Sequence, residues 1–227
     1  MVEVAGLSLH TSRSTLRRDL HAAVAAGGHH HHLSVNANKL AHLADPAFAS
    51  LAHRATSAAA DGASVCWLAA QRGARVERIP GCELADELLH DAAEQGWRTY
   101  LYGGRPAVLA AVATLADERG VPVVGACDGY AHDRGVVAQA IHAARPQLLL
   151  VALGTPAAER FIDRHRFEAL CLGVGGTFDV LAGAVRRAPR WTHPLGLEGV
   201  WRVASEPRAR ALPFLRGARA VLRAWRA

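Results

Sequence analysis

One carboxylate in this sequence stands where it could act as a general base. Asp61 follows a run of alanines and precedes Gly62, and a glycine there allows a sharp turn that leaves the carboxylate open to a ligand. A single carboxylate on a loop can remove the proton from an attacking hydroxyl, which is what an inverting group transfer requires. Taken alone, however, an Asp-Gly pair marks a turn far more often than a base.

Glycine-rich segments follow three of the expected strands. They are Gly103-Gly104, Gly154-Thr155-Pro156 and the run from Gly173 to Thr177. Loops without side chains bring backbone amides close to phosphate oxygens. None of the three has the dinucleotide fingerprint or the Lys-Ser/Thr of a P-loop. Together they favour a nucleotide or sugar-phosphate site at one edge of a sheet.

The sequence offers little support for a metal or another cofactor. It contains no Asp-x-Asp string, so we expect no cofactor, and charge on a leaving group would be stabilised by amides and arginines. The four histidines from His29 to His32 could suggest a metal site, but adjacent strand residues point to opposite faces. The four cysteines are scattered without a Cys-x-x-Cys pair, which is typical of reduced thiols in a cytosolic protein.

Basic charge is concentrated at the C-terminal end. The chain has a net charge of +6, and residues 186–227 alone carry ten arginines against two glutamates. Such a tail favours an anionic partner, which could be phosphate head groups, a nucleotide diphosphate or nucleic acid. We expect no nucleic acid, because the tail has no interleaved aromatic platform and no known binding motif.

The spacing of apolar residues and glycines predicts the elements that must position these groups. Strands alternating with helices of about a dozen residues indicate an α/β fold with a mainly parallel, Rossmann-like sheet and helices on both faces. Ligands then bind at the carboxyl ends of the strands. The expected strands are 32–36, 64–68, 98–102, 121–126, 147–153 and 171–174, and the expected helices are 12–26, 38–59, 84–95, 107–119, 135–144 and 158–170.

The alternation of strands and helices stops near residue 190, so we divide the chain into an α/β core (1–190) and a basic helical appendage (191–227). A last helix over 214–226 places an apolar arc beside four arginines. The arc suits either a membrane interface or docking onto the core with the arginines in solvent. The chain shows no apolar run of spanning length and no secretory signal, so membrane contact would be peripheral. The arc comprises Phe214, Leu215, Ala218, Val221, Leu222 and Trp225, and the arginines are Arg216, Arg219, Arg223 and Arg226.

Read in order, several segments resemble the WecG/TagA/CpsF glycosyltransferases, and together they cover nearly the whole chain. The most specific is the glycine loop that leads into "RAPRW", in combination with the Asp-Gly pair after "SVNAN". The matching segments are "SVNANKLAHLADP", "ADGASVCWLA", "ERIPGCELADELL", "YLYGGRP", "ACDGY", "LVALGTPAAE", "GVGGTFDVLAGAVRRAPRW" and "GLEGVWRVASEP".

The resemblance implies an inverting transfer from a UDP-sugar, of the N-acetylmannosamine or uronic acid type, to an acceptor on undecaprenyl diphosphate. Such enzymes act in teichoic acid, exopolysaccharide or related cell-envelope assembly, as cytoplasmic proteins peripheral to the inner face of the membrane. Asp61 is then the base, and the C-terminal appendage (191–227) supplies arginines to the diphosphate and helps to target the membrane. Expected substrate-binding residues are Ser34, Asn36, Arg78, Gly103, Gly104, Asp128, Tyr130, Gly154, Pro156, Glu159, Gly175, Gly176 and Arg202.

The sequence also departs from the family pattern. Ser34 replaces a threonine and keeps its hydroxyl, whereas Ala157-Ala158 replaces a Lys-Gln pair and removes a pocket glutamine. The arginines after Pro207 stand out of the usual register. These changes leave the identity of the donor sugar open. They also allow an alternative function, that of a catalytically degenerate module that binds a nucleotide-sugar or a membrane. A homo-oligomer is also left open.

Overall fold

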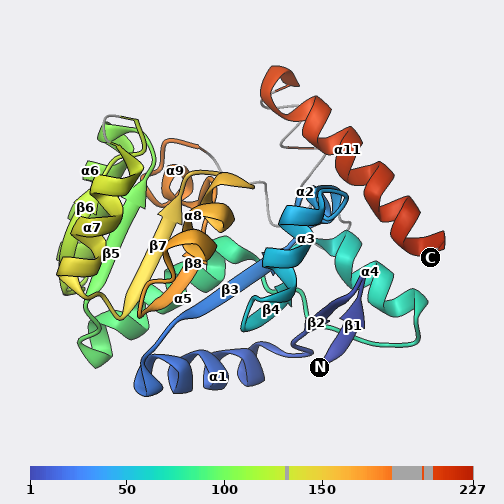
Figure 1. Cartoon of the computed structure of the whole chain (residues 1–227), viewed down its shortest axis with the longest axis horizontal. Coiled ribbons are helices and arrows are strands. Elements are labelled where there is room, and N and C mark those ends of the chain that lie inside the picture. The colour runs from blue at the N-terminus through green and yellow to red at the C-terminus, as the bar shows by residue number, and fades with distance from the viewer. Residues whose placement is uncertain (131–132, 186–200, 202–206, 227) are drawn as a thin grey trace.

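A six-stranded parallel sheet forms the centre of the protein in the computed structural model, which describes residues 1–130, 133–185, 201 and 207–226 (Figure 1). The strand order is β4-β3-β8-β7-β5-β6. All six strands therefore end at the same edge, as predicted for a Rossmann-like sheet. The strands are β3 (His30–Val35), β4 (Ser57–Ala60), β5 (Thr99–Gly103), β6 (Val123–Cys127), β7 (Leu148–Ala152) and β8 (Leu170–Gly173).

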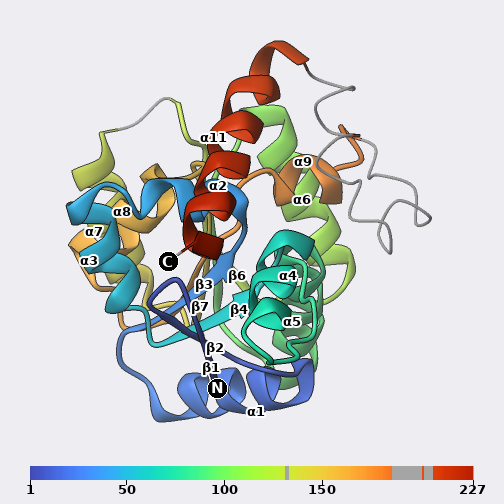
Figure 2. The same cartoon turned by 90° about the vertical axis from the view of Figure 1, so that its right-hand side faces the viewer.

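Helices cover both faces of this sheet, and a two-stranded hairpin, β1 (Val2–Val4) and β2 (Leu7–Leu9), precedes them. Figure 2 shows α7 and α8 on one side of the strands and α5, α6 and α9 on the other. The helices are α1 (Arg13–Ala26), α2 (Ala37–His42), α3 (Pro46–His53), α4 (Ala63–Gln71), α5 (Gly81–Gln95), α6 (Pro106–Glu118), α7 (Arg134–Ala144), α8 (Ala157–His165), α9 (Thr177–Leu181) and α11 (Pro207–Arg226).

Alternate residues of the central strands point into two different cores. In β7, Leu148 and Leu150 pack with α1, α5 and α6, whereas Leu149 and Val151 pack with α7 and α8. This is the period-two pattern of a strand that is buried on both faces, and it explains why β7 reads as an unbroken apolar run. A third core lies between the hairpin, β3, β4 and helices α2 to α4.

Two predicted elements in the N-terminal half are wrong. The segment 64–68 is part of helix α4, and the strand is 57–60, because a short apolar run fits a buried helix as well as a strand. The single helix expected over 38–59 is two helices and strand β4. The break between the helices follows from Asp45, which caps α3, and from Pro46 in its first turn.

Helix α11 packs across α2 and α4 (Figures 1 and 2). It begins at Pro207, seven residues before the predicted start. Neither α11 nor any other helix among the described residues is long and apolar enough to cross a membrane. Helices α2 and α11 come close at Gly217, where an added Cβ would lie 3.0 Å from the Cβ of Ala37. Ala220, Val221 and Ala224 pack beside Gly217 on the core.

The predicted apolar arc of this helix is therefore not the surface that docks. Of its large side chains only Val221 packs on the core, while Phe214, Leu215, Leu222 and Trp225 are 41–55% exposed. The small residues Gly217, Ala220 and Ala224 dock instead, because they allow the two helices to come close. The docked helix thus still presents an apolar surface to solvent.

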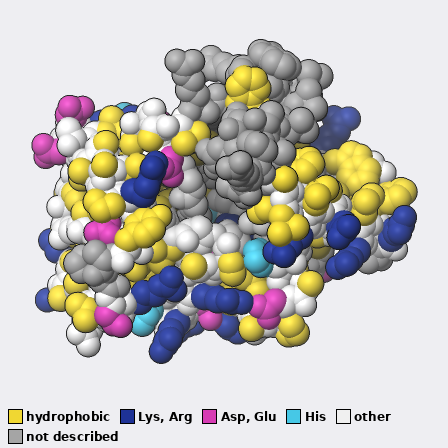
Figure 3. All heavy atoms as spheres, turned by 90° about the horizontal axis from the view of Figure 1, so that it is seen from above, with side chains coloured by type: hydrophobic (Ala, Val, Ile, Leu, Met, Phe, Trp, Pro, Cys, Tyr) yellow, Lys and Arg dark blue, Asp and Glu magenta, His cyan; other side chains and the backbone are white. Residues whose placement is uncertain are grey.

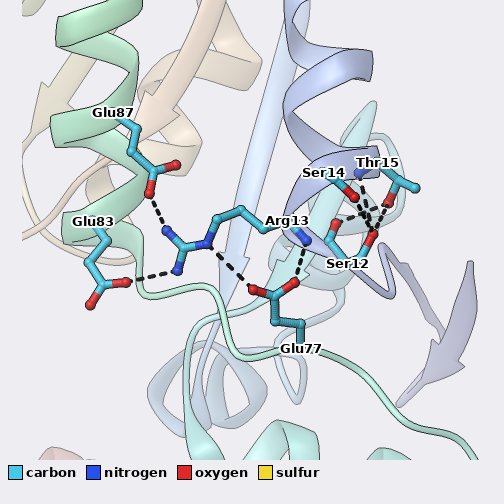
Figure 4. Close-up of polar contacts among 7 residues, drawn as sticks. All are labelled: Ser12, Arg13, Ser14, Thr15, Glu77, Glu83 and Glu87. Carbon is cyan, nitrogen blue, oxygen red and sulfur yellow. Dashed lines mark hydrogen bonds and ion pairs between the residues drawn. The ribbon is translucent and has the colours of Figure 1, made fainter.

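An ion-pair cluster joins the start of α1 to α5 (Figure 4). The guanidinium of Arg13 contacts the carboxylates of Glu77, Glu83 and Glu87, and its backbone N–H donates to Glu77 Oε2 at 2.7 Å. Figure 4 also shows Ser12, which caps α1 by accepting a hydrogen bond from the backbone N–H of Thr15. The cluster fixes the segment between α4 and α5.

Candidate active site

A small cavity lies at the carboxyl ends of β3, β4, β7 and β8. Its volume is about 110 Å³. Because these strands are parallel, side chains that follow them in the sequence meet at one edge of the sheet. The cavity is lined by Ser34, Asn36, Lys39, Asp61, Gly81, Cys82, Thr155, Gly173, Val174, Gly175, Gly176, Thr177 and Val180.

Both carboxylate oxygens of Asp61 are held by hydrogen bonds. Oδ2 accepts from Asn36 Nδ2 at 2.9 Å, and Oδ1 accepts from the backbone N–H of Gly81 at 2.9 Å. The backbone is fixed as well, since Arg78 Nε donates to the carbonyl oxygen of Asp61 at 2.9 Å. An ionised carboxylate has about four acceptor sites, so each oxygen can still accept a proton or a second hydrogen bond.

Asn36 uses both ends of its amide. Its Oδ1 accepts from the backbone N–H of Lys39 at 3.1 Å and so caps α2, while its Nδ2 donates to Asp61. Capping is the ordinary role of an asparagine before a helix. Here it also orients the amide nitrogen toward the carboxylate.

Gly81 stands where a larger residue would crowd the cavity. A Cβ at this position would lie 3.1 Å from Ser34 Oγ and 4.0 Å from the Asp61 carboxyl carbon. Ser34 itself is buried at the end of β3. The absence of a side chain therefore lets the start of α5 bring its N–H to Asp61 without displacing the serine hydroxyl.

Lys39 brings a positive charge to the cavity. Its ammonium lies 3.0 Å from Glu159 Oε1, and the same oxygen accepts from the hydroxyl of Thr155 at 3.1 Å. Glu159 lies behind Lys39 and Thr155 and does not line the cavity. The pair places one cation beside a carboxylate, a serine hydroxyl and a glycine loop.

A second cluster of loops follows β5, β6 and β7. Gly103 has φ +107°, and a Cβ there would lie 2.6 Å from the backbone of Ala152, so only glycine fits. The backbone N–H of Gly129 donates to Gly104 O at 3.0 Å, which joins the β5 and β6 loops. Tyr130 beside them is 76% exposed.

The structure thus divides the predicted site residues into groups. Around the cavity it gathers Ser34, Asn36, Asp61, Gly175 and Gly176, with Arg78 bonded to the backbone of Asp61. The other residues that the sequence predicted for substrate binding do not line the cavity. They lie at neighbouring strand ends and loops or on helix α8: Gly103, Gly104, Asp128, Tyr130, Gly154, Pro156 and Glu159. Arg202 lies outside the described residues.

Sequence reasoning missed several residues of the cavity. Lys39 reads as one polar position of a helix, and its burial depends on the pairing with Glu159. Gly81 and Cys82 open α5, which reaches Asp61 only through the folding of the 72–80 segment. Of these, only Gly81, which follows a proline before an apolar period, carried a local signal in the sequence.

The fold is an α/β fold with a parallel sheet, and its polar cavity beside the Asp61 carboxylate lies at the carboxyl edge, where open α/β sheets ordinarily bind ligands. Residues 2–227 match the family model described as the glycosyl transferase WecG/TagA/CpsF family. The chain therefore belongs to the WecG/TagA/CpsF family of glycosyltransferases. Such an enzyme takes a nucleotide-sugar donor and transfers its sugar to an acceptor.

Proposed function

We propose that this protein is an inverting glycosyltransferase in which Asp61 is the catalytic base. The observation that carries the proposal is the way the Asp61 carboxylate is held by Asn36 and the N–H of Gly81 at the wall of a cavity. Inversion needs one base, and its carboxylate must be oriented before the acceptor hydroxyl arrives. The hydroxyl attacks the anomeric carbon, its proton passes to Asp61, and the nucleotide diphosphate leaves.

The cavity also offers groups that suit a diphosphate leaving group. The Lys39 ammonium, although paired with Glu159, has further N–H groups to donate, and the backbone of Gly175 and Gly176 lies without side chains at the same wall. Stabilising the charge that develops on the leaving group is commonly the largest contribution to such catalysis. We assign Ser34 and Asn36 to donor binding together with Arg78, and the loops at Gly103, Gly104, Asp128, Tyr130, Gly154 and Pro156 to the outer part of the donor.

The proposed donor is a UDP-sugar of the N-acetylmannosamine or uronic acid type, and the proposed acceptor is a sugar on undecaprenyl diphosphate. The family resemblance supports both, and a role in cell-surface polysaccharide assembly is part of the same proposal. A panel of UDP-sugars, scored by release of UDP in the presence of a lipid-linked acceptor, identifies the donor. Binding of a UDP-sugar without release of UDP would instead favour the degenerate binding module.

Replacing Asp61 by asparagine tests the base directly. The asparagine side chain has almost the same shape but cannot take the proton, so the transfer rate is expected to fall by at least ~100-fold. Asp86→Asn is the matched control, because Asp86 pairs with Arg119 on the surface of α5, away from the cavity. A transfer rate near wild type for the Asp61→Asn variant would show that Asp61 is not the base.

We further propose that residues 191–227 form an appendage through which the enzyme binds the inner face of the cell membrane. The support is α11, whose exposed Leu222 and Trp225 lie beside arginines, with the exposed Trp67 of α4 next to Trp225. Figure 3 shows hydrophobic and basic side chains mixed over this part of the surface. Apolar side chains flanked by cations suit an anionic lipid interface.

Vesicle binding tests this surface. Replacing Leu222 and Trp225 by serine is expected to weaken co-sedimentation with anionic vesicles, and added salt should weaken the binding of the wild type. Val136→Ser is the control, because Val136 is also an exposed apolar residue but lies on α7. Equal co-sedimentation of both variants would count against this role.

A further inference from the structure

The segment that leads from α4 into α5 supplies two of the contacts that hold Asp61. Arg78 Nε donates to the carbonyl oxygen of Asp61, and the backbone N–H of Gly81 donates to its carboxylate Oδ1, both at 2.9 Å. Residues 74–80 form neither a helix nor a strand, so no regular pattern of backbone hydrogen bonds fixes them. The position of the Gly81 N–H therefore depends on what holds this segment from outside.

Helix α1 holds the segment at both of its ends through one side chain (Figure 4). At one end, Arg13 Nε lies 3.6 Å from Glu77 Oε1, and the backbone N–H of Arg13 donates to Glu77 Oε2 at 2.7 Å. At the other end, Nη2 donates to Glu83 Oε2 at 2.8 Å, and Nη1 contacts Glu87. The guanidinium thus grips the chain on both sides of the residues that bond Asp61.

Two backbone hydrogen bonds tie the same segment to its neighbours. The N–H of Glu77 donates to the carbonyl oxygen of Thr11 at 2.9 Å, just before α1 begins. The N–H of Ile79 donates to the carbonyl oxygen of Ala60 at 2.7 Å, at the end of β4. The segment is therefore bonded first to the start of α1 and then to the strand end beside Asp61, so a shift at α1 would be transmitted to the carboxylate.

The cluster at Arg13 is partly shielded from solvent and stands outside the cavity. The side chain of Arg13 is 26% exposed, and those of Glu83 and Glu87 are 31% and 28% exposed. Without the guanidinium, the carboxylates gathered around it would repel one another and move apart. Arg13 does not line the cavity, so it does not touch a substrate bound there. Any effect of Arg13 on the reaction must pass through the residues that it holds.

We propose that Arg13 is a positioning residue for the transfer reaction, because it holds the Gly81 N–H against the carboxylate of Asp61. This inference rests on the proposed function of Asp61 as the base. A carboxylate that is oriented before the acceptor hydroxyl arrives reacts faster than one that must first be ordered. When the segment is released, Oδ1 loses its donor, and the carboxylate is held only by the amide of Asn36 at Oδ2.

Hydrogen exchange at the Gly81 amide tests this positioning without any transfer reaction. The N–H is bound to Asp61 Oδ1, so it is expected to exchange slowly in the wild type. Arg13→Gln should accelerate its exchange by about tenfold, because local opening of the segment becomes easier.

Arg17→Gln is the matched control for the exchange experiment. Arg17 stands one turn further along α1 and pairs with Asp91, near the other end of α5. In this variant the exchange of the Gly81 amide should stay within a factor of about two of wild type. Equal acceleration in the Arg13 and Arg17 variants, or no acceleration in either, would overturn the proposal.

Steady-state kinetics tests whether the position of the segment matters for catalysis. Arg13→Gln should lower kcat by about tenfold and leave KM within a factor of about two, because the substrates contact other residues. Arg17→Gln should leave kcat near wild type. Arg13→Lys keeps the charge but offers a single ammonium in place of the guanidinium fork, so its kcat should lie between those of Arg13→Gln and the wild type.

A double variant separates positioning from a simple loss of folded protein. In the Asp61→Asn background, Arg13→Gln should lower the residual rate little further, because the carboxylate through which it acts is gone. A smaller folded fraction would instead lower the rate by the same factor in both backgrounds. That result would show that Arg13 is merely structural.

The positioning and the proposed function can fail separately. If exchange at Gly81 responds to Arg13→Gln alone while Asp61→Asn transfers sugar at the wild-type rate, the contact stands but Asp61 is not the base, and Arg13 does not serve the reaction through it. If Asp61→Asn is slow while Arg13→Gln transfers sugar at the wild-type rate, the base stands and Arg13 is not a positioning residue.

Discussion

The ammonium of Lys39 lies 3.0 Å from Glu159 Oε1, and the two side chains are only 5% and 1% exposed. This pair joins α2 to α8 beneath the cavity at Asp61. A buried ion pair is costly to break, because the remaining charge stays in a poorly solvated place. The pair thus gives Lys39 a fixed position without leaving the protein an unpaired cation.

A double-mutant cycle is expected to show this coupling. Lys39→Met and Glu159→Leu should each lower the free energy of unfolding by about 3–5 kcal/mol, because each leaves one charge unpaired. The double variant should lose less than the sum, since it leaves no buried charge. Denaturant unfolding of the four proteins gives these values, and additive losses would contradict the prediction.

Acid is expected to destabilise the fold through two buried histidines of β3. Burial, reinforced by Lys39, lowers the pKa of His31 to about 4 and that of His32 to about 3 from the ordinary 6.5. The unfolded chain takes up these protons near pH 6.5, whereas the folded chain does not. Stability is therefore full above pH 6.5 and falls below it toward pH 4, by about 1.4 kcal/mol per pH unit for each histidine.

Unfolding in guanidinium at about pH 7.5 and about pH 5 measures this loss. His31→Leu should reduce the pH dependence, because it removes one of the two groups that the unfolded chain protonates. His90→Leu serves as the control, since His90 is an exposed residue of α5. An unchanged pH dependence for the His31 variant would show that the loss arises elsewhere.

The docking of α11 is expected to depend on Gly217. A leucine there would collide with Ala37, whose Cβ lies only 3.0 Å from the position of an added Cβ. Gly217→Leu should therefore separate α11 from α2, and the undocked helix should fray, so that trypsin cleaves faster after its already exposed arginines. Ala218→Leu adds the same side chain at the next, exposed position and should leave proteolysis unchanged. Similar cleavage rates for the two variants would rule out the close contact.

The cluster at Arg13 is expected to stabilise the segment that carries Arg78. Arg13→Gln leaves Glu77, Glu83 and Glu87 without their shared cation, so stability should fall by about 1–3 kcal/mol, and by less in high salt. Arg18→Gln is the control, because Arg18 pairs with the adjacent Asp19 at an exposed position and with no other carboxylate in the described part of the chain. Thermal unfolding at low and high salt measures both, and equal losses would contradict a special role of Arg13.

Much of the sheet was predictable from the sequence because its strands are bounded by glycines and filled with large aliphatic residues, as in β7 and β8. Strand β4 was not, since Ser57–Ala60 contains only serine and alanine and lacks the β-branched residues typical of strands. The N-terminal hairpin was also missed. Its strands have three residues each, too short to show a period.

The candidate site was only partly predictable for a related reason. Asn36 was expected at the carboxyl end of a strand, and the topology of a parallel sheet brings that end to the site. Asp61 was expected before a strand and instead follows β4, so its selection rested on the Asp-Gly pair and the family resemblance. Lys39 and Gly81 belong to helices, so their arrival at the cavity depends on how those helices pack. Glu159, which the family resemblance indicates as a substrate-binding residue, belongs to α8 and is paired with Lys39, and no sequence pattern predicted that pairing.

The bifunctional amide of Asn36 limits what can replace it. Aspartate and serine also cap helices well, so either would preserve the start of α2. Aspartate would set a second negative charge against Asp61, and serine would be too short to reach it. Position 36 therefore tolerates fewer residues than the cap of a helix ordinarily does, and a substitution there that leaves the fold intact would still remove the hydrogen bond that orients the Asp61 carboxylate.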